Sequence, residues 1–229
     1  KMKLAGLQKT TLLDFPGKVA CTVFLSGCNF RCPFCQNAEI LDGSISDISE
    51  EEFFAFLNKR RGLLDGVCVS GGEPLIHADI GEFLGKIKDL GYSVKLDTNG
   101  AFPERLKELC GEGLVDRVAM DIKNSPERYA KTAGAEIDIG KIKESAAFLM
   151  SGAVGYEFRT TVVKQLHRAE DMLKIGQWLK GAQAYFLQNF RDSDTVLKRG
   201  LSPLSDEELE AFKRLLRPFI PAVRIRGEL

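Results

Sequence analysis

Apolar and polar positions follow two different patterns along this chain. Short, nearly continuous apolar runs rich in β-branched residues predict strands, and they cover residues 17–26, 66–70, 92–96, 114–120, 156–163 and 184–187. Apolar residues at helical spacing lie between these runs. They predict helices after Ser49, from 78 to 90, at Pro103, after Ser125, from 142 to 150, through 172–179 and after Ser205. Strand and helix alternate about six times with short connections, which favours a parallel α/β architecture. A doubly wound sheet and an open, incomplete barrel both fit this order.

Two of the predicted helices carry clear start signals. Ser49 stands three residues before Glu52, and Ser205 three residues before Glu208. In this spacing the serine side chain and the glutamate side chain can each bind a free backbone N–H of the first turn. Gly91 is a suitable end for the helix over 78–90.

Polar motifs follow the predicted strands, each at a carboxyl end. The first strand runs into Cys28-Asn29-Phe30-Arg31-Cys32-Pro33-Phe34-Cys35, and the next three run into Gly71-Gly72-Glu73-Pro74, Asp97-Thr98-Asn99-Gly100 and Asp121-Ile122-Lys123. The sixth ends in Gln188-Asn189-Phe190-Arg191. Carboxyl ends of parallel strands meet at one edge, where ligands of such folds gather. We therefore expect one shared site.

The cysteine loop is the strongest chemical signal. Cys28, Cys32 and Cys35 lie within eight residues, and no fourth cysteine follows nearby. A structural zinc site is normally closed by four protein ligands. Three thiolates with one open position suit a [4Fe-4S] cluster whose fourth iron binds an exchangeable ligand. A zinc knuckle, or a group of reduced thiols without metal, is the alternative.

Composition narrows the class of protein. The chain has 229 residues, of which 44% are hydrophobic and 28% charged, with 32 basic and 32 acidic side chains. This balance gives no reason to expect a nucleic-acid or membrane partner. No apolar run approaches the roughly 20 residues needed to span a bilayer, and no signal sequence is evident. We expect one domain over residues 1–229 in the cytoplasm, with Cys21, Cys68 and Cys110 as reduced core residues.

Each of the other motifs also has an ordinary structural interpretation. The two glycines and the proline of 71–74 are common in a turn between a strand and a helix, and Asn99-Gly100 is a common turn pair. Lys123 could be a surface residue. Arg159, a charge within a strand-like run, points either into the mouth of the sheet or to an exposed edge. His77 and His167 are expected to face solvent or to cap, without a catalytic role.

The C-x3-C-x2-C loop together with Gly-Gly-Glu-Pro resembles the radical SAM superfamily. Residues 8–18, the ending Cys35-Gln36-Asn37 and the stretch 223–227 are similar to activases of glycyl radical enzymes. The resemblance covers nearly the whole chain and is nearest to the anaerobic ribonucleoside-triphosphate reductase activating proteins. It implies an incomplete (β/α)6 TIM-like barrel. It also implies an enzyme that cleaves S-adenosylmethionine (SAM) reductively at a [4Fe-4S] cluster, and forms a glycyl radical on a partner of the ribonucleotide reductase or pyruvate formate-lyase type.

The resemblance also implies roles for individual residues. Three cysteines, Cys28, Cys32 and Cys35, would hold the cluster. The SAM-binding residues would be Phe34 near the adenine, Gly71, Gly72 and Glu73 at the methionyl amino group, Asp97, Thr98 and Asn99 near the ribose and carboxylate, and Lys123 and Arg159. A monovalent cation would be held by Asp97, Thr98 and Asp121, with a backbone carbonyl near Ala119. Between Cys35 and Gly71 there is no ferredoxin-like insertion, so electrons would come from a separate flavodoxin or ferredoxin.

Two other functions remain open at this point. The first is a small-molecule radical SAM enzyme of the 7-carboxy-7-deazaguanine synthase type, which also has a short chain and a truncated barrel. The second is a zinc-binding interaction module without catalysis. The sequence does not name the partner enzyme, the electron donor or the oligomeric state.

Overall fold

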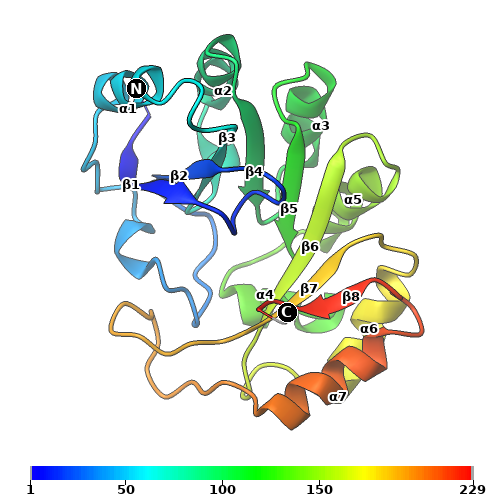
Figure 1. Cartoon of the computed structure of the whole chain (residues 1–229). Coiled ribbons are helices and arrows are strands. Elements are labelled where there is room, and N and C mark those ends of the chain that lie inside the picture. Colours follow the sequence, from blue (N-terminus) through cyan, green and yellow to red (C-terminus); the bar gives the residue numbers. More distant parts are fainter. Residues whose placement is uncertain (1, 228–229) are drawn as a thin grey trace.

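The computed structural model describes residues 2–227 and contains one curved sheet whose strands follow one another in chain order (Figure 1). The strands are β1 (Leu4–Thr11), β2 (Ala20–Leu25), β3 (Gly66–Gly71), β4 (Ser93–Thr98), β5 (Arg117–Asp121), β6 (Gly155–Val162), β7 (Tyr185–Asn189) and β8 (Val223–Ile225). β1 pairs with β2 in antiparallel fashion, and all later neighbours are parallel. The incomplete α/β barrel expected from the sequence is confirmed.

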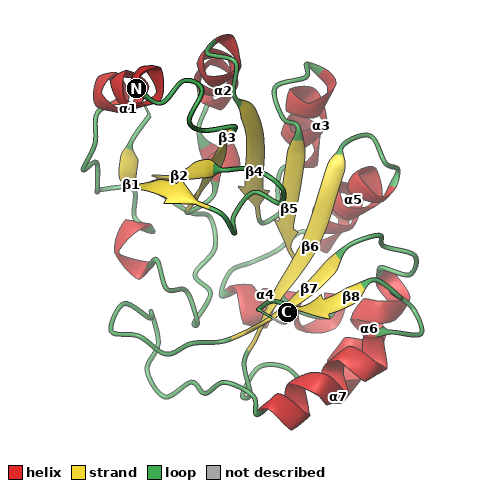
Figure 2. Cartoon of the chain, in the orientation of Figure 1, coloured by secondary structure: helices red, strands yellow, loops and turns green. Residues whose placement is uncertain are grey.

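Helices follow the outside of the curved sheet (Figure 2). They are α1 (Glu50–Lys59), α2 (Ile80–Asp89), α3 (Pro103–Gly111), α4 (Tyr129–Ala133), α5 (Ile139–Met150), α6 (Ala169–Trp178) and α7 (Asp206–Leu216), with short 3-10 turns η1 (Ala38–Ile40), η2 (Pro74–Ile76) and η3 (Pro126–Arg128). Both predicted capping boxes are present, because Ser49 and Glu52, like Ser205 and Glu208, exchange hydrogen bonds at the starts of α1 and α7. The helix expected after Ser125 is instead a 3-10 turn followed by the short α4.

The two faces of the parallel strands differ in chemistry. Successive side chains of a strand point to opposite faces. On β4, Val94 and Leu96 are buried among apolar residues, whereas Lys95 and Asp97 pair with each other on the inner face. On β6, Phe158 is likewise buried, and its neighbour Arg159 reaches Asp97 across the barrel. The outer face thus holds the helices, and the inner face carries the polar groups.

The sequence analysis missed both edge strands. β1 contains Gly6 and the polar stretch from Gln8 to Thr11, so it lacks an apolar run, and β8 has only three residues. The first predicted strand also began too early, since β2 starts at Ala20. The six strands that were predicted correspond to β2–β7. Edge strands bury one side at most, which explains why their sequence pattern is weak.

Candidate active site

A cavity of about 430 Å³ opens at the carboxyl ends of the strands. It contains most of the residues that the sequence placed in one site, and its size lies in the range of small-molecule pockets. Its wall includes Cys28, Cys32, Phe34, Cys35, Gly71, Gly72, Asp97, Thr98, Asn99, Asp121, Lys123 and Arg159, and on the β7 side Gln188, Asn189 and Arg191. The predicted convergence of strand-end motifs is therefore observed.

The cysteine loop is held by backbone hydrogen bonds to three other parts of the chain. Cys28 N–H donates to the carbonyl of Leu41 (3.1 Å), and Arg31 N–H to that of Ala133 (2.9 Å). On the other side, Leu197 N–H donates to the carbonyl of Cys35 (3.1 Å). A loop tied in this way presents its thiols from a fixed backbone, as a metal-binding loop requires.

The three thiols lie on the wall of one cavity without converging on a single point. Within residues 2–227, no three Cys, His, Asp or Glu side chains are grouped closely enough for one metal ion. A [4Fe-4S] cluster is wider than one ion, because each thiolate binds a different iron. Burial raises the pKa of the Cys28 thiol to about 12 and also raises the pKa values of Cys32 and Cys35. Metal binding would therefore displace protons from these thiols.

Gly72 is required by the close approach of the cysteine loop, and Gly71 by its backbone conformation and the adjacent backbone of β2. Gly71 has a φ of 116°, in the region that favours glycine. A Cβ on Gly72 would lie 1.9 Å from the carbonyl oxygen of Gly27. That carbonyl accepts a hydrogen bond from the backbone N–H of Glu73 (2.9 Å). The Gly-Gly-Glu-Pro turn and the cysteine loop are thus packed backbone to backbone.

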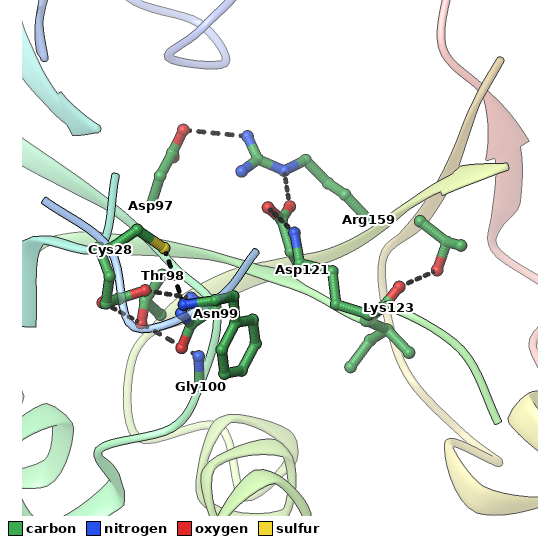
Figure 3. Close-up of polar contacts among 12 residues, drawn as sticks. Cys28, Asp97, Thr98, Asn99, Gly100, Asp121, Lys123 and Arg159 are labelled. Atoms are coloured by element: carbon green, nitrogen blue, oxygen red, sulfur yellow. Dashed lines mark hydrogen bonds and ion pairs between the residues drawn. The ribbon is translucent and has the colours of Figure 1, made fainter. Parts of the chain in front are cut away.

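Charged side chains from β4, β5 and β6 form the opposite wall (Figure 3). Arg159 lies between two carboxylates: its Nε donates to Asp121 Oδ1 (2.9 Å) and its Nη1 to Asp97 Oδ2 (3.1 Å). Lys123 Nζ pairs with Asp121 Oδ2 (3.0 Å), and its ammonium lies 5.9 Å from the centre of the Phe34 ring. The Arg159 guanidinium holds the pKa values of both Asp97 and Asp121 below their usual range despite burial.

Comparison with known proteins identifies the family. A profile described as the radical SAM superfamily matches residues 22–163, which is more than half of the chain. The chain belongs to the radical SAM superfamily. The family implies a [4Fe-4S] cluster and SAM, so the open position inferred from the three cysteines has a known kind of occupant.

Two curated proteins are similar to this chain in sequence, and a solved structure is similar in fold. A "Putative glycyl-radical enzyme activating enzyme" of Methanocaldococcus jannaschii is 29% identical over 99% of this chain and 96% of its own length. The pyruvate formate-lyase-activating enzyme of Listeria monocytogenes is 33% identical, over 56% of each chain. The crystal structure of Streptococcus suis SuiB bound to precursor peptide SuiA has a TM-score of 0.69, with 14% identity, over 90% of this chain and 48% of that one.

Glu73 of this radical SAM chain does not lie on the cavity wall. Its carboxylate is fully buried and accepts hydrogen bonds from Leu75 N (3.1 Å), Thr98 Oγ1 (2.8 Å) and Asn99 N (2.6 Å). Burial raises its pKa to about 7, while these hydrogen bonds act in the opposite direction. The structure therefore brings Glu73 together with Thr98 and Asn99 and uses its carboxylate to hold them.

Two residues on the inner face were missed by the sequence analysis. Lys95 is only 1% exposed, and its Nζ contacts Asp97 Oδ1 at 2.5 Å. Arg226, in the wall of the cavity, pairs with the buried Glu157 (2.6 Å). The sequence could have indicated Lys95, because a lysine between Val94 and Leu96 in a buried strand needs a partner of opposite charge.

The expectations for histidines and unassigned cysteines are only partly met. His167 is 3% exposed, so the prediction that it faces solvent or caps a helix is wrong; it hydrogen-bonds to the backbone of Lys123 and Val163. Cys21 and Cys68 are buried free thiols as predicted, whereas Cys110 is half-buried. No helix within residues 2–227 combines the length and apolar character needed to cross a bilayer.

Proposed function

We propose that this protein is a radical SAM activase that forms a glycyl radical on a partner enzyme. One observation carries the proposal: three cysteine thiols and a wall of paired cations and carboxylates face each other across one cavity. Similarity over nearly the whole chain to a glycyl-radical enzyme activating enzyme supports the activase class. When bound, the reduced [4Fe-4S] cluster and SAM supply a 5′-deoxyadenosyl radical, which takes a hydrogen atom from a glycine of the partner.

Residues of this chain would bind and orient these groups. Cys28, Cys32 and Cys35 are proposed to hold three irons, and Phe34 to pack near the adenine. The backbone of Gly71 and Gly72, exposed in the cavity wall, would receive the methionyl amino group. In this assignment Glu73 is a positioning residue, because its carboxylate fixes the neighbouring strand end without reaching the cavity.

The polar wall would bind the rest of SAM. Asp97, Thr98 and Asn99 are proposed to approach the ribose. Lys123 and Arg159 carry positive charge in the wall and would attract the SAM carboxylate. Asn99 also donates through its Nδ2 to Asn29 Oδ1 (2.7 Å), which ties this strand end to the cysteine loop. Both halves of the site are therefore connected through their own side chains.

A protein is the proposed substrate. Within residues 2–227 the sheet begins at β1 and ends at β8, so the barrel is not closed. An open barrel admits a chain segment, and the similar fold of SuiB has been crystallised with its precursor peptide. Anaerobic ribonucleotide reductase and pyruvate formate-lyase are the two candidate partner types. A flavodoxin or ferredoxin is proposed as the electron donor.

Electron paramagnetic resonance on anaerobically reconstituted protein tests this proposal. The protein is mixed with SAM, dithionite and either a pyruvate formate-lyase or an anaerobic ribonucleotide reductase. A glycyl doublet with one of them, absent when the target glycine is replaced by alanine, is the expected result. Formation of 5′-deoxyadenosine without any doublet across glycyl radical enzymes would contradict the activase role and favour a small-molecule substrate. No 5′-deoxyadenosine from cluster-loaded protein would overturn the radical chemistry itself.

A further inference from the structure

The carboxylates expected to hold a monovalent cation already have positively charged partners. Asp97 Oδ1 accepts from Lys95 and Oδ2 from Arg159, while Asp121 Oδ1 accepts from Arg159 and Oδ2 from Lys123. Every oxygen of the pair therefore contacts a lysine or arginine nitrogen. Asp97 also accepts from the Ser70 hydroxyl at 3.0 Å. These residues do not fit a metal ion in the arrangement that the structure shows.

The third expected ligand is also engaged elsewhere. Thr98 Oγ1 donates to the buried Glu73 carboxylate at 2.8 Å and accepts from Gly100 N–H at 3.1 Å. Its side chain is 3% exposed. A cation near Asp97 and Asp121 would thus lack the hydroxyl oxygen that the resemblance implied.

The local charge balance also disfavours a bound metal cation. Three cations (Lys95, Lys123 and Arg159) surround two carboxylates (Asp97 and Asp121), which leaves one net positive charge. A bound K⁺ or Na⁺ would raise this excess in a partly desolvated site, where repulsion between like charges is strong. An anionic ligand group, by contrast, would be attracted to the excess.

We propose that the guanidinium of Arg159 takes the place of a monovalent cation in this protein. It lies between Asp97 and Asp121, as a shared ion would, and it also forms part of the cavity wall. A planar guanidinium has five N–H donors, so it can hold two carboxylates and still present a donor to a third. Binding of the SAM carboxylate at this position rests on the proposed function; the independence from added K⁺ or Na⁺ does not.

Thermal melting of cluster-free protein provides the first test. Unfolding is followed in KCl, NaCl and tetramethylammonium chloride at equal ionic strength. The melting temperature of the wild type is expected to agree within about 1 °C across the three salts. An increase of several degrees that saturates with K⁺ or Na⁺ would overturn the proposal, whatever reaction the protein catalyses.

Arg159→Met supplies the second test. This variant leaves two carboxylates against two lysines, and its melting temperature is expected to become higher in KCl than in tetramethylammonium chloride. Arg117→Met is the matched control, because Arg117 pairs with the carboxylate of Glu157 (3.5 Å) on the neighbouring strand and does not line the cavity. It should lose stability without becoming sensitive to the choice of salt.

Reductive cleavage of SAM completes the experiment. Loaded wild-type protein is expected to form 5′-deoxyadenosine at rates within about twofold in the three salts. Arg159→Met should be slower by about 10-fold or more, as expected for loss of a charged contact, with Arg159→Lys partly restoring the rate. If Arg159→Met binds and cleaves SAM as the wild type does in tetramethylammonium chloride, no cation is needed there and the proposal is wrong. Should the variant not fold, the wild-type salt series still decides.

Discussion

Two polar networks meet at the end of β5, and they differ in how far the protein itself satisfies their charges and hydrogen bonds. The cavity network consists of Lys95, Asp97, Asp121, Lys123 and Arg159. The rear network lies on the segments that follow β5 and β6, including α4 and α6, and consists of Asn124, Ser125, Thr132, His167 and Asp171. Residues 121 and 123 belong to the first network and residues 124 and 125 to the second. One strand end thus supplies both.

The rear network is satisfied by the protein itself. Asn124 Nδ2 donates to Thr132 Oγ1 (2.8 Å) and to the carbonyl of Leu166 (3.1 Å). Ser125 Oγ donates to Asp171 Oδ1 (2.9 Å). Val163 N–H donates to His167 Nδ1, so His167 Nε2 carries the proton and donates to the Lys123 carbonyl (2.9 Å). Such a network stabilises the loops but has no group left for a ligand.

The cavity network instead keeps a net positive charge beside a cavity. The comparison teaches that burial alone does not mark a residue of the candidate site: Asn124 is more buried than Asp121. What distinguishes the network in the candidate site is charge that the chain only partly compensates. Substitutions in the cavity network should therefore reduce the rate of SAM cleavage, and substitutions in the rear network should reduce the free energy of unfolding.

The largest expected effect comes from the cysteine loop. Cys32→Ala removes one of the three proposed cluster ligands, so formation of 5′-deoxyadenosine should fall by at least about 100-fold, the upper end of the range for partners of metal ligands. The cluster-free protein should melt close to the wild type, since one buried sulfur is lost. Iron content and product chromatography measure both effects. Cys110→Ala, on α3, is the control, and equal loss in that variant would contradict the assignment.

Asn124→Ala should produce the opposite pattern. It leaves Thr132 Oγ1 without its donor and the Ser125 N–H without its acceptor in a buried site, at a cost of about 3 kcal/mol in the free energy of unfolding, while Arg128 still donates to the Leu166 carbonyl. Urea denaturation measures this loss. Asn58→Ala is the control, because Asn58 is exposed and donates only to Phe54 of its own helix. If Asn124→Ala abolished SAM cleavage while keeping wild-type stability, the division between the networks would be wrong.

Glu73→Gln tests a residue that belongs to neither network but holds the cavity wall in place. The amide nitrogen of the glutamine is a donor and would face one of the N–H or O–H groups that now donate to the carboxylate, so that hydrogen bond would be lost. We expect a loss of about 2 kcal/mol in the free energy of unfolding, together with weaker SAM binding by equilibrium dialysis. Unchanged stability combined with lost SAM affinity would instead indicate direct contact between the Glu73 carboxylate and SAM.

The smallest effect concerns pH. Burial lowers the pKa of His167, so the unfolded chain binds a proton at this residue before the folded protein does. The stabilisation that neutral His167 provides is complete above the pKa of this residue in the unfolded chain, about 6.5, and it is lost as the pH falls below that value. The free energy of unfolding then changes by at most about 1.4 kcal/mol per pH unit. Denaturation of wild type and His167→Asn between pH 7.5 and 5 measures the difference. A variant with the wild-type pH dependence would refute this role.

Glu73 changes the free energy of unfolding in the opposite direction over nearly the same pH range. Its folded pKa of about 7 lies above the usual value of 4.5, so its contribution is largest at low pH and is lost as pH rises toward 7. The His167 comparison should therefore be repeated in Glu73→Gln. Removal of the glutamate should make the decline on acidification steeper.

The sequence predicted the positions of strands better than the directions of side chains. The six apolar runs fold as β2–β7, and strand-end motifs converge because parallel strands share an edge. Their detailed partners depend on loops. Glu73 turns away from the cavity because Leu75, Thr98 and Asn99 supply donors behind it, and no spacing in the chain shows this. The buried state of His167 was not expected from the sequence, because Leu166 is the only apolar residue among its neighbours Gln165, Leu166 and Arg168.

Charge partners were partly predictable. That Arg159 faces the mouth of the barrel was one of two alternatives, and the structure selects it. Its two partners come from different strands, more than 35 residues away in the chain. Only the lateral register of β4, β5 and β6 brings them together. The SAM contacts of Phe34, Asn99 and Lys123 stay predictions.

The contact between Gly72 and the Gly27 carbonyl has a mechanical consequence. With no side chain between them, the turn that follows β3 and the loop that carries the cysteines cannot slide past each other independently. Any fluctuation that lifts the cysteine loop must also shift the adjoining turn. Inactivation by heat or oxygen would then proceed in one step. Protein that retains the iron but no longer binds SAM should therefore not accumulate.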